Sequence, residues 1–347
     1  MPAAPPRDRS GFDVLIICAL PIEADAVEAI FDVYYEGVND YGAAPDDPNS
    51  YATGAIGNHN VVLLRMPGMG SISSASTAAN VRLSFPAIRL ALVVGICGAV
   101  PHYQSKDIFL GDIIVSRLIV QYDFGRQYPT KFERKTAMED SFGRPSVRIR
   151  SLLATLEGKR KQKMMTDLIS TTLQEMQDED SDYTWPGAAT DLSFDASYYH
   201  KHRSTCEECL AEDSVGCSVS RSATCDKLAC AEHASTQVRR RPEFDGLHRP
   251  AIHIGRMGCA NTVMKSGHDR DRWATEDSLI GFEMEGAGVW DNYPSLVIKA
   301  VCDYADSHKN KAWQIYTTAV AAAAAKALLK EWRPPVETQA GRPNSCT

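Results

Sequence analysis

Three acidic residues follow apolar runs, at positions where they could act on a bound ligand. Glu23 comes directly after LIICALPI, Glu285 lies in FEMEGAGVW, and Asp303 closes VIKAVCD. Carboxyl groups accept hydrogen bonds and exchange protons, and ligands of open α/β sheets bind at the carboxyl ends of strands. Taken singly, each acid also fits a plainer role, as a helix-dipole partner or a turn cap. Only their convergence at one sheet edge would make a strong site.

The first half of the chain supplies the elements that position Glu23. The apolar run from Phe12 to Leu20 is typical of a strand buried on both faces, and Pro21 suits the first turn of a helix over 22–31. Periodicity and turn residues predict three further elements here: a hairpin over 51–66 around Gly57-Asn58, a helix over 73–83 and a strand over 90–96.

The second half positions the other two acids. A strand over 280–285 enters a helix through Gly286-Ala287-Gly288, and a strand over 296–301 ends at Cys302-Asp303. The remaining predicted elements are a strand pair over 108–119 around Gly111-Asp112, a charged helical region over 130–182, a strand from 251 and a helix over 312–332. Strands that alternate with helices over this length predict a three-layer α/β fold.

We expect one domain over residues 12–332. Residues 183–249 are rich in Ser, Asp, His, Arg and Cys and contain few apolar runs, so we interpret them as an insertion without a core of their own. Residues 1–11 are expected to be disordered, and the polar tail 333–347 is expected to be loose.

Composition narrows the class of protein. The 347 residues are 44% hydrophobic and 23% charged, which are ordinary values for a globular chain. A net charge of -7 argues against non-specific binding to nucleic acid or to an anionic membrane surface. The N-terminus lacks the apolar core of a signal peptide, and no apolar run is long enough to span a bilayer, so we expect a cytoplasmic location.

Five cysteines crowd the segment from Cys206 to Cys230. A CxxC pair with later Cys and His residues is able to hold structural zinc in a closed tetrahedral site, for which the ligands would be Cys206, Cys209, Cys225 and Cys230. The flanking histidines are His200, His202 and His233. Free thiols and disulfides stay open as alternatives, although disulfides are unusual in a reducing compartment. No cofactor is needed for the chemistry considered below.

Five segments carry a resemblance to a known family. They are DVLIICALPIEADAV, MPGMGSISSASTAANV, ALVVGICGAVP, FEMEGAGVW and VIKAVCDYADSHKN. Their order resembles that of the nucleoside phosphorylase/nucleosidase superfamily, and DYADSHKN and VQYDFGRQYP resemble its fungal purine and uridine phosphorylase-like branch. The resemblance implies a phosphorylase/hydrolase-like fold with a central mixed, partly barrel-like β-sheet, and it implies a homo-oligomer.

The resemblance also implies roles for individual residues. Glu285 would bind the ribose hydroxyls, Met284 would pack on the sugar and Glu283 would flank the pocket. Asp303 would protonate or hydrogen-bond purine N7 as the base leaves. Weaker candidates are a sugar-side loop at Gly70, an entrance residue at Phe124 and a base-side loop at Asn261. Met284 also has a plainer interpretation as core filler.

The residue at position 23 distinguishes an enzyme that uses water as the nucleophile from one that uses phosphate. The resemblance implies that a glutamate here activates water, whereas hexameric phosphorylases of the superfamily bind phosphate through arginines and a serine. At two of those anchor positions this chain carries Val93 and Ile96, which are apolar. We therefore expect water to be the nucleophile, although backbone N–H groups near Gly68 and Gly70 could partly substitute as phosphate donors.

The sequence thus predicts an enzyme that hydrolyses purine nucleosides to free base and ribose. One alternative is a purine nucleoside phosphorylase. Two others are a nucleosidase that acts on a nucleotide such as AMP or ATP, and a non-catalytic nucleotide-sensing module, which ranks lower because all three acids are present.

Overall fold

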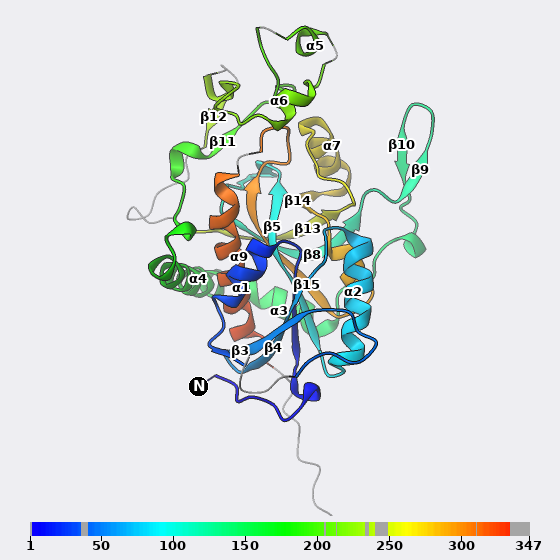
Figure 1. The fold of residues 1–347 in the computed structure, drawn as a ribbon. Helices are drawn as coiled ribbons and strands as arrows, with labels where there is room; N and C mark the ends of the chain where they lie inside the picture. Colours follow the sequence, from blue (N-terminus) through cyan, green and yellow to red (C-terminus); the bar gives the residue numbers. More distant parts are fainter. Residues whose placement is uncertain are drawn as a thin grey trace, which may run out of the picture.

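The computed structural model describes residues 2–35, 41–204, 206–212, 214–232, 236–239, 249–309 and 311–333. These residues form a central mixed sheet of nine strands in the order β14-β13-β8-β15-β5-β1-β4-β3-β2 (Figure 1). The strands are β1 (Val14–Cys18), β2 (Val33–Tyr34), β3 (Tyr51–Ile56), β4 (His59–Arg65), β5 (Leu90–Ala99), β8 (Ile113–Gln121), β13 (Ile252–Cys259), β14 (Leu279–Glu283) and β15 (Ser295–Asp303).

One end of the sheet closes on itself. Strand β14 pairs in parallel with β13 and antiparallel with β5, through Gly281 opposite Ala99 and Phe282 opposite Gly98. Strands β14, β13, β8, β15 and β5 therefore form a closed ring, while β1, β4, β3 and β2 extend from β5 as an open sheet. This confirms the predicted α/β fold with a mixed, partly barrel-like sheet.

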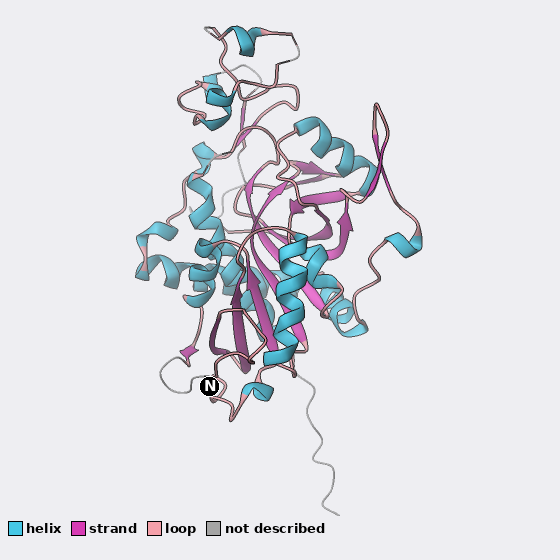
Figure 2. Ribbon diagram, turned by 45° about the vertical axis from the view of Figure 1, so that its right-hand side comes forward, coloured by secondary structure: helices cyan, strands magenta, loops and turns pink. Residues whose placement is uncertain are grey.

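Helices cover the sheet on both sides (Figure 2). Helix α9 packs on β15 and β5 and on its neighbours α1 and α4, whereas α2 packs against α8. Alanine favours helix formation, and the small side chains of the buried run Ala321–Ala325 let α9 lie close to the strands. The helices of this body are α1 (Pro21–Glu28), α2 (Ser71–Ser84), α3 (Val147–Leu156), α4 (Lys159–Glu179), α7 (Gly267–Asp277), α8 (Gly286–Trp290) and α9 (Ala312–Glu331).

The hairpin and most predicted strands and helices lie within a few residues of their expected positions. The strand pair predicted over 108–119 is wrong, because only β8 forms there. The buried Asp112 carboxylate accepts hydrogen bonds from the N–H groups of Phe109 and Ala251, which hold residues 108–112 in a turn. Gly111 supports this turn with a φ of 84°, a left-handed conformation that glycine adopts readily.

Three short two-stranded sheets lie outside the main sheet, and the first two of them are hairpins. They are β6 (His102–Tyr103) with β7 (Lys106–Asp107), β9 (Gly125–Gln127) with β10 (Phe132–Arg134), and β11 (Leu192–Ser193) with β12 (Gln237–Val238). The β9–β10 hairpin projects away from the body, and its second strand lies inside the region 130–182 that the sequence predicts to be helical (Figure 1).

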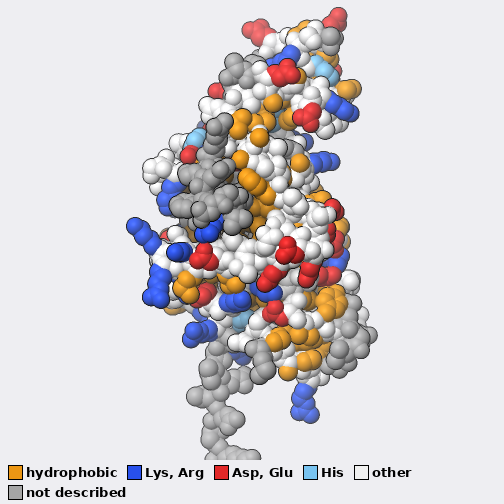
Figure 3. All heavy atoms as spheres, turned by 90° about the vertical axis from the view of Figure 1, so that its left-hand side faces the viewer, with side chains coloured by type: hydrophobic (Ala, Val, Ile, Leu, Met, Phe, Trp, Pro, Cys, Tyr) orange, Lys and Arg blue, Asp and Glu red, His pale blue; other side chains and the backbone are white. Residues whose placement is uncertain are grey.

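The cysteine-rich segment lies at one end of the molecule. Its short helices α5 (Glu207–Leu210) and α6 (Ser218–Ser222) stand above α7 in Figure 1. In the space-filling view, the described part of this segment forms a narrow projection above the body (Figure 3).

The first residues of the chain make specific contacts where the sequence predicts disorder. The Ala3 N–H donates to the Gly57 carbonyl at 2.8 Å, and the Tyr35 hydroxyl donates to the Ala3 carbonyl at 2.9 Å. Of the tail predicted to be loose, residues 334–347 lie outside the described residues. Among the described residues, no helix combines the length and the apolar composition that crossing a bilayer requires.

Candidate functional site

A cavity of about 440 Å³ opens where β1, β5, β14 and β15 end. Five of the residues singled out in the sequence line it together: Glu23, Glu283, Met284, Glu285 and Asp303. They come from segments far apart in the chain. The parallel pairing of β15 with β5 and of β5 with β1, together with the antiparallel pairing of β14 with β5, brings those segments side by side. The lining also includes apolar side chains, among them Met69, Ile96, Met264 and Phe282.

Glu23 is held by three backbone N–H groups. One carboxylate oxygen, Oε2, accepts from Ala19 and Leu20, both at 2.9 Å, and the other, Oε1, accepts from Ile96 at 2.8 Å. The residue is only 2% exposed. The space beside it is available because residue 95 is glycine; a Cβ there would lie 1.9 Å from Glu23 Oε1. Glu23 is therefore fixed at the floor of the cavity.

A buried lysine joins two of the acids. The Lys299 ammonium lies 3.2 Å from Glu285 Oε2 and 3.7 Å from Glu23 Oε1, and its side chain is 1% exposed. Burial opposes a charge on Lys299, but the carboxylates of Glu23, Glu285 and Glu283 outweigh it and raise the pKa of the ammonium. Lys299 thus compensates the negative charge that these acids bring into a site screened from water.

Glu283 and Glu285 share the entry to helix α8. Glu283 Oε2 accepts from the N–H groups of Glu285 at 2.9 Å and Gly286 at 2.8 Å, while Glu283 Oε1 has no hydrogen-bond partner among the described residues. Burial, and then the charge of Glu285, raise the pKa of Glu283. Glu283 therefore shapes the turn, and the Glu285 carboxylate faces the cavity, where it also accepts a 3.4 Å contact from the Gly70 N–H.

Asp303 ends β15 with its carboxylate tied to the following loop. Its Oδ1 accepts from the Ala305 N–H at 2.8 Å and from the Lys309 ammonium at 2.5 Å. Burial opposes a charge on Lys309, but Asp303 outweighs it and raises the pKa of the ammonium. The loop after β15 thus fixes the direction of the Asp303 side chain.

Two of the weaker candidates, Asn261 and Phe124, lie outside the cavity lining. Asn261 does not line the cavity; its Oδ1 accepts from the Ser71 N–H at 2.9 Å and so anchors the turn at Gly70 that precedes α2. Phe124 is 42% exposed and lies under the Lys135 ammonium, and it is not part of the cavity lining. Its place at the entrance stays a prediction.

The cysteines form two groups where the sequence suggested one zinc site. Cys206 and Cys209 lie with Cys217 and His202, whereas Cys225 and Cys230 lie beside His200. The reason is the fold of the segment, because the turn at Cys217 returns the chain to the CxxC pair before Cys225 is reached. The described cysteines form no disulfide, and His233 lies outside the described residues.

Two lysines of the site were missed from the sequence. A signal existed for Lys299, because it is the only charge within the apolar run SLVIKAVC. No signal distinguished Lys309, because its partner is defined only by the course of the loop. Two more lysines, Lys265 and Lys311, line the cavity with exposed side chains and form no ion pair with any residue that the structure describes.

Comparisons with known proteins cover most of the chain. The family model described as "Phosphorylase superfamily" matches residues 13–331. A nucleotide-binding leucine-rich repeat (NLR)-like protein of Hyaloscypha variabilis is 30% identical over 319 residues, which are 90% of this chain. This chain spans only 28% of the length of that relative.

Several solved structures have a similar fold. The Helicobacter pylori 5′-methylthioadenosine/S-adenosylhomocysteine nucleosidase matches with a TM-score of 0.54 and 15% identity, over 93% of this chain and 100% of that one. Futalosine hydrolase of the same organism matches with a TM-score of 0.54 and 15% identity, over 93% and 99%. The Streptococcus pneumoniae MTA/SAH nucleosidase in complex with 8-aminoadenine matches with a TM-score of 0.53 and 16% identity, over 92% and 100%.

Proposed function

Because the chain belongs to the phosphorylase superfamily, we propose that it is a purine nucleosidase, which uses water to cleave the N-glycosidic bond of a purine nucleoside. In this proposal Glu285 binds the ribose hydroxyls, Met284 packs against the sugar, Asp303 assists departure of the base and Glu23 activates the water. The products are the free base and ribose.

The hydrogen bonds at Glu23 are the observation that favours water over phosphate as the nucleophile. Backbone N–H groups at a strand end and at a helix start are the donors that would otherwise receive a phosphate. Here the N–H groups of Ala19, Leu20 and Ile96 all donate to the Glu23 carboxylate. A phosphate would have to displace a buried carboxylate from these donors and would meet its charge, whereas a neutral water meets neither obstacle.

The proposed reaction follows from these positions. The bond between C1′ and the purine nitrogen breaks, and its electron pair moves into the base. Asp303 in its protonated form passes its proton to the base, which lowers the barrier to departure of the base, and the resulting carboxylate is stabilised by the Lys309 ammonium. C1′ becomes positively charged, and the carboxylates of Glu23 and Glu285 stabilise that charge. The water oxygen bonds to C1′ and passes a proton to Glu23.

A second candidate substrate is a purine nucleotide such as AMP or ATP. The observation that favours it is the pair of exposed lysines, Lys265 and Lys311, on the cavity lining. Ammonium groups on flexible stems bind phosphates as point charges. In this version the cleaved bond and the roles of the acids are unchanged, and the products are the base and a ribose phosphate.

Product analysis tests the proposal. The purified protein is incubated with adenosine, inosine, guanosine, uridine, AMP and ATP, with and without phosphate, and both products are identified by chromatography. Release of purine and ribose without phosphate is the expected result. Ribose 1-phosphate formed only with phosphate would establish a phosphorylase instead. Cleavage of nucleotides alone would favour the second candidate, and no cleavage of any substrate would favour a non-catalytic sensing module.

Two substitutions test the assigned roles. Asp303→Asn should lower kcat by about 10²–10⁴-fold if the carboxyl assists base departure. Glu23→Gln should abolish hydrolysis and leave nucleoside binding measurable by calorimetry. Asp46→Asn, at an exposed turn away from the cavity, is the matched control and should keep the full rate. An unchanged rate in folded Asp303→Asn protein would refute the mechanism.

A further inference from the structure

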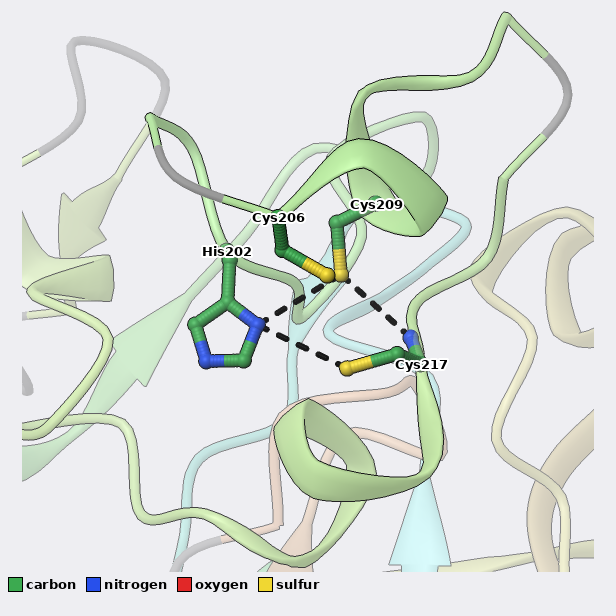
Figure 4. Close-up of side chains that lie close together, drawn as sticks. All are labelled: His202, Cys206, Cys209 and Cys217. Carbon is green, nitrogen blue, oxygen red and sulfur yellow. Dashed lines mark hydrogen bonds between the residues drawn. The ribbon is translucent and has the colours of Figure 1, made fainter.

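Four side chains of the cysteine-rich segment point at one small volume. The ligand atoms of His202, Cys206, Cys209 and Cys217 all lie within 4.8 Å of one another, and Figure 4 shows the imidazole and the three sulfurs converging, with Cys206 at the N-cap of α5 and Cys209 within that helix. Cys209 and Cys217 are buried, and the other two are half-buried. Three thiols and one imidazole form a Cys₃His set, which is a ligand set of structural zinc sites.

The distances in this first cluster fit a tetrahedral metal. His202 Nδ1 lies 3.5 Å from Cys209 Sγ and 3.6 Å from Cys217 Sγ. A tetrahedral zinc with bonds of about 2.3 Å to sulfur and about 2.05 Å to nitrogen separates the two ligand atoms by about 3.6 Å. These two separations therefore match a tetrahedral zinc, and the remaining ligand atoms lie within 4.8 Å of one another.

Backbone donors support the sulfurs. The Cys217 N–H donates to Cys209 Sγ, and the Ser220 N–H donates to Cys217 Sγ, each at 3.3 Å. Such donors stabilise sulfur in its thiolate form, which is the form that binds zinc. The cluster thus has ligands, spacing and outer partners of a metal site.

A second cluster lies beside the first and has its own evidence. His200, Cys230 and His308 are all buried, with their ligand atoms within 4.8 Å of one another. Cys230 Sγ lies 3.3 Å from His200 Nδ1 and Cys225 Sγ lies 3.7 Å from the same atom, close to the separation of about 3.6 Å given above. Cys225 lies outside the group of three, but its sulfur is near enough to His200 to become the fourth ligand after a small shift toward His308.

The two imidazoles of this second cluster are arranged for a metal. His200 Nε2 is paired with the Ala223 carbonyl at 2.9 Å, which leaves Nδ1 with a lone pair toward the sulfurs. The His308 side chain is 1% exposed, and its Nδ1 lies 3.6 Å from Asp306 Oδ1, but neither ring nitrogen has a hydrogen-bond partner among the described residues. Buried polar nitrogens are rarely left unsatisfied, and a metal would use one of them.

We propose that the chain binds two zinc ions, one through His202, Cys206, Cys209 and Cys217 and one through His200, Cys225, Cys230 and His308. The ions would add to the small hydrophobic cluster of this segment, whose buried members among the described residues are Phe194, Tyr198 and Cys230. The second ion also fastens the segment to the loop after β15, because His308 belongs to that loop and the His200 N–H already donates to Ser307 Oγ at 3.0 Å. Lys309, the next residue, contacts Asp303.

Metal analysis of the whole chain tests the proposal. The protein is purified with a tag that binds no metal and under reducing conditions, and its zinc is measured by mass spectrometry. Two zinc ions per chain are expected from the two clusters. Cys209→Ser and Cys230→Ser should each retain one ion, and Cys18→Ala, a buried cysteine of β1, should retain both.

Cobalt substitution covers the case in which a variant does not fold. Wild-type protein reconstituted with Co²⁺ should show thiolate-to-cobalt charge-transfer bands and tetrahedral d–d bands. Absence of zinc and of these bands would overturn the proposal and leave the cysteines as free thiols. A single zinc ion that is lost in Cys209→Ser but kept in Cys230→Ser would overturn the second site alone.

Activity gives a further readout for the second site. Cys230→Ser should lower kcat by about 10-fold or more, because a loosened loop misplaces Asp303, and Cys209→Ser should lower it less. This expectation rests on the proposed function, whereas the metal content does not, so failure of one is distinguishable from failure of the other.

Discussion

The sharpest structural prediction concerns the substitution Lys299→Met. At an effective dielectric constant of about 20, the attraction of Lys299 to Glu285 at 3.2 Å is about 5 kcal/mol and to Glu23 at 3.7 Å about 4.5 kcal/mol. The cost of burying the ammonium, several kcal/mol, offsets part of this. Because Lys299→Met leaves two buried carboxylates without a counterion, we expect the free energy of unfolding to fall by about 3–5 kcal/mol.

Urea unfolding followed by fluorescence and circular dichroism measures this loss. Lys161→Met is the matched control, because its ammonium lies only 2.9 Å from Glu331, but both side chains are about a quarter exposed. Exposed pairs of this kind contribute about 0.2–1 kcal/mol, so the control should change little. The double variant Lys299→Met/Glu285→Gln should lose less than Lys299→Met alone. Equal losses below about 1 kcal/mol in Lys299→Met and the control would refute a compensating role for the buried ammonium.

Two further predictions rest on packing and on pH. Gly95→Ala would place a Cβ 1.9 Å from Glu23 Oε1, so kcat should fall by about 10²-fold in a folded protein, whereas Gly143→Ala, where a Cβ meets nothing within 4 Å, should keep its rate. Burial opposes a charge on His59, but its contact with Asp13 at 2.8 Å and two carbonyls at the end of α9 outweigh it and raise its pKa above 6.5. Since the folded pKa is the raised one, the stabilisation is complete below pH 6.5 and is lost as pH rises through the folded pKa. His59→Gln should therefore lower Tm more at pH 6 than at pH 8.5; an equal loss at both values would contradict a charged imidazole.

The regular elements follow from local pattern, and most were predicted. Continuous apolar runs defined β1 and β5, Gly57-Asn58 defined the first hairpin, and the alanine run defined α9. The turn at residues 108–112 was missed because its stability comes from the Asp112 carboxylate, which accepts a hydrogen bond from the N–H group of Ala251. A hydrogen bond between distant segments leaves no mark in the local periodicity.

In the candidate site, too, the sequence indicated some residues and not others. The positions of Glu23, Glu285 and Asp303 after apolar runs marked them as residues that would make a strong site if they converged, and all three line the cavity. Their partners were invisible in the sequence. That the Ile96 N–H donates to Glu23 and that Lys309 meets Asp303 depends on the register of β5 and the course of a loop.

The sequence by itself determined the fold class and the order of the elements, and it predicted the three acids of the candidate site, because each depends on the type and spacing of neighbouring residues. Only the tertiary structure decided how the sheet closes through β14 and β5, which charge compensates the acids, and how the cysteines and histidines divide into two clusters. These depend on distances of a few ångströms between residues far apart in the chain, and spacing along the sequence does not specify such distances.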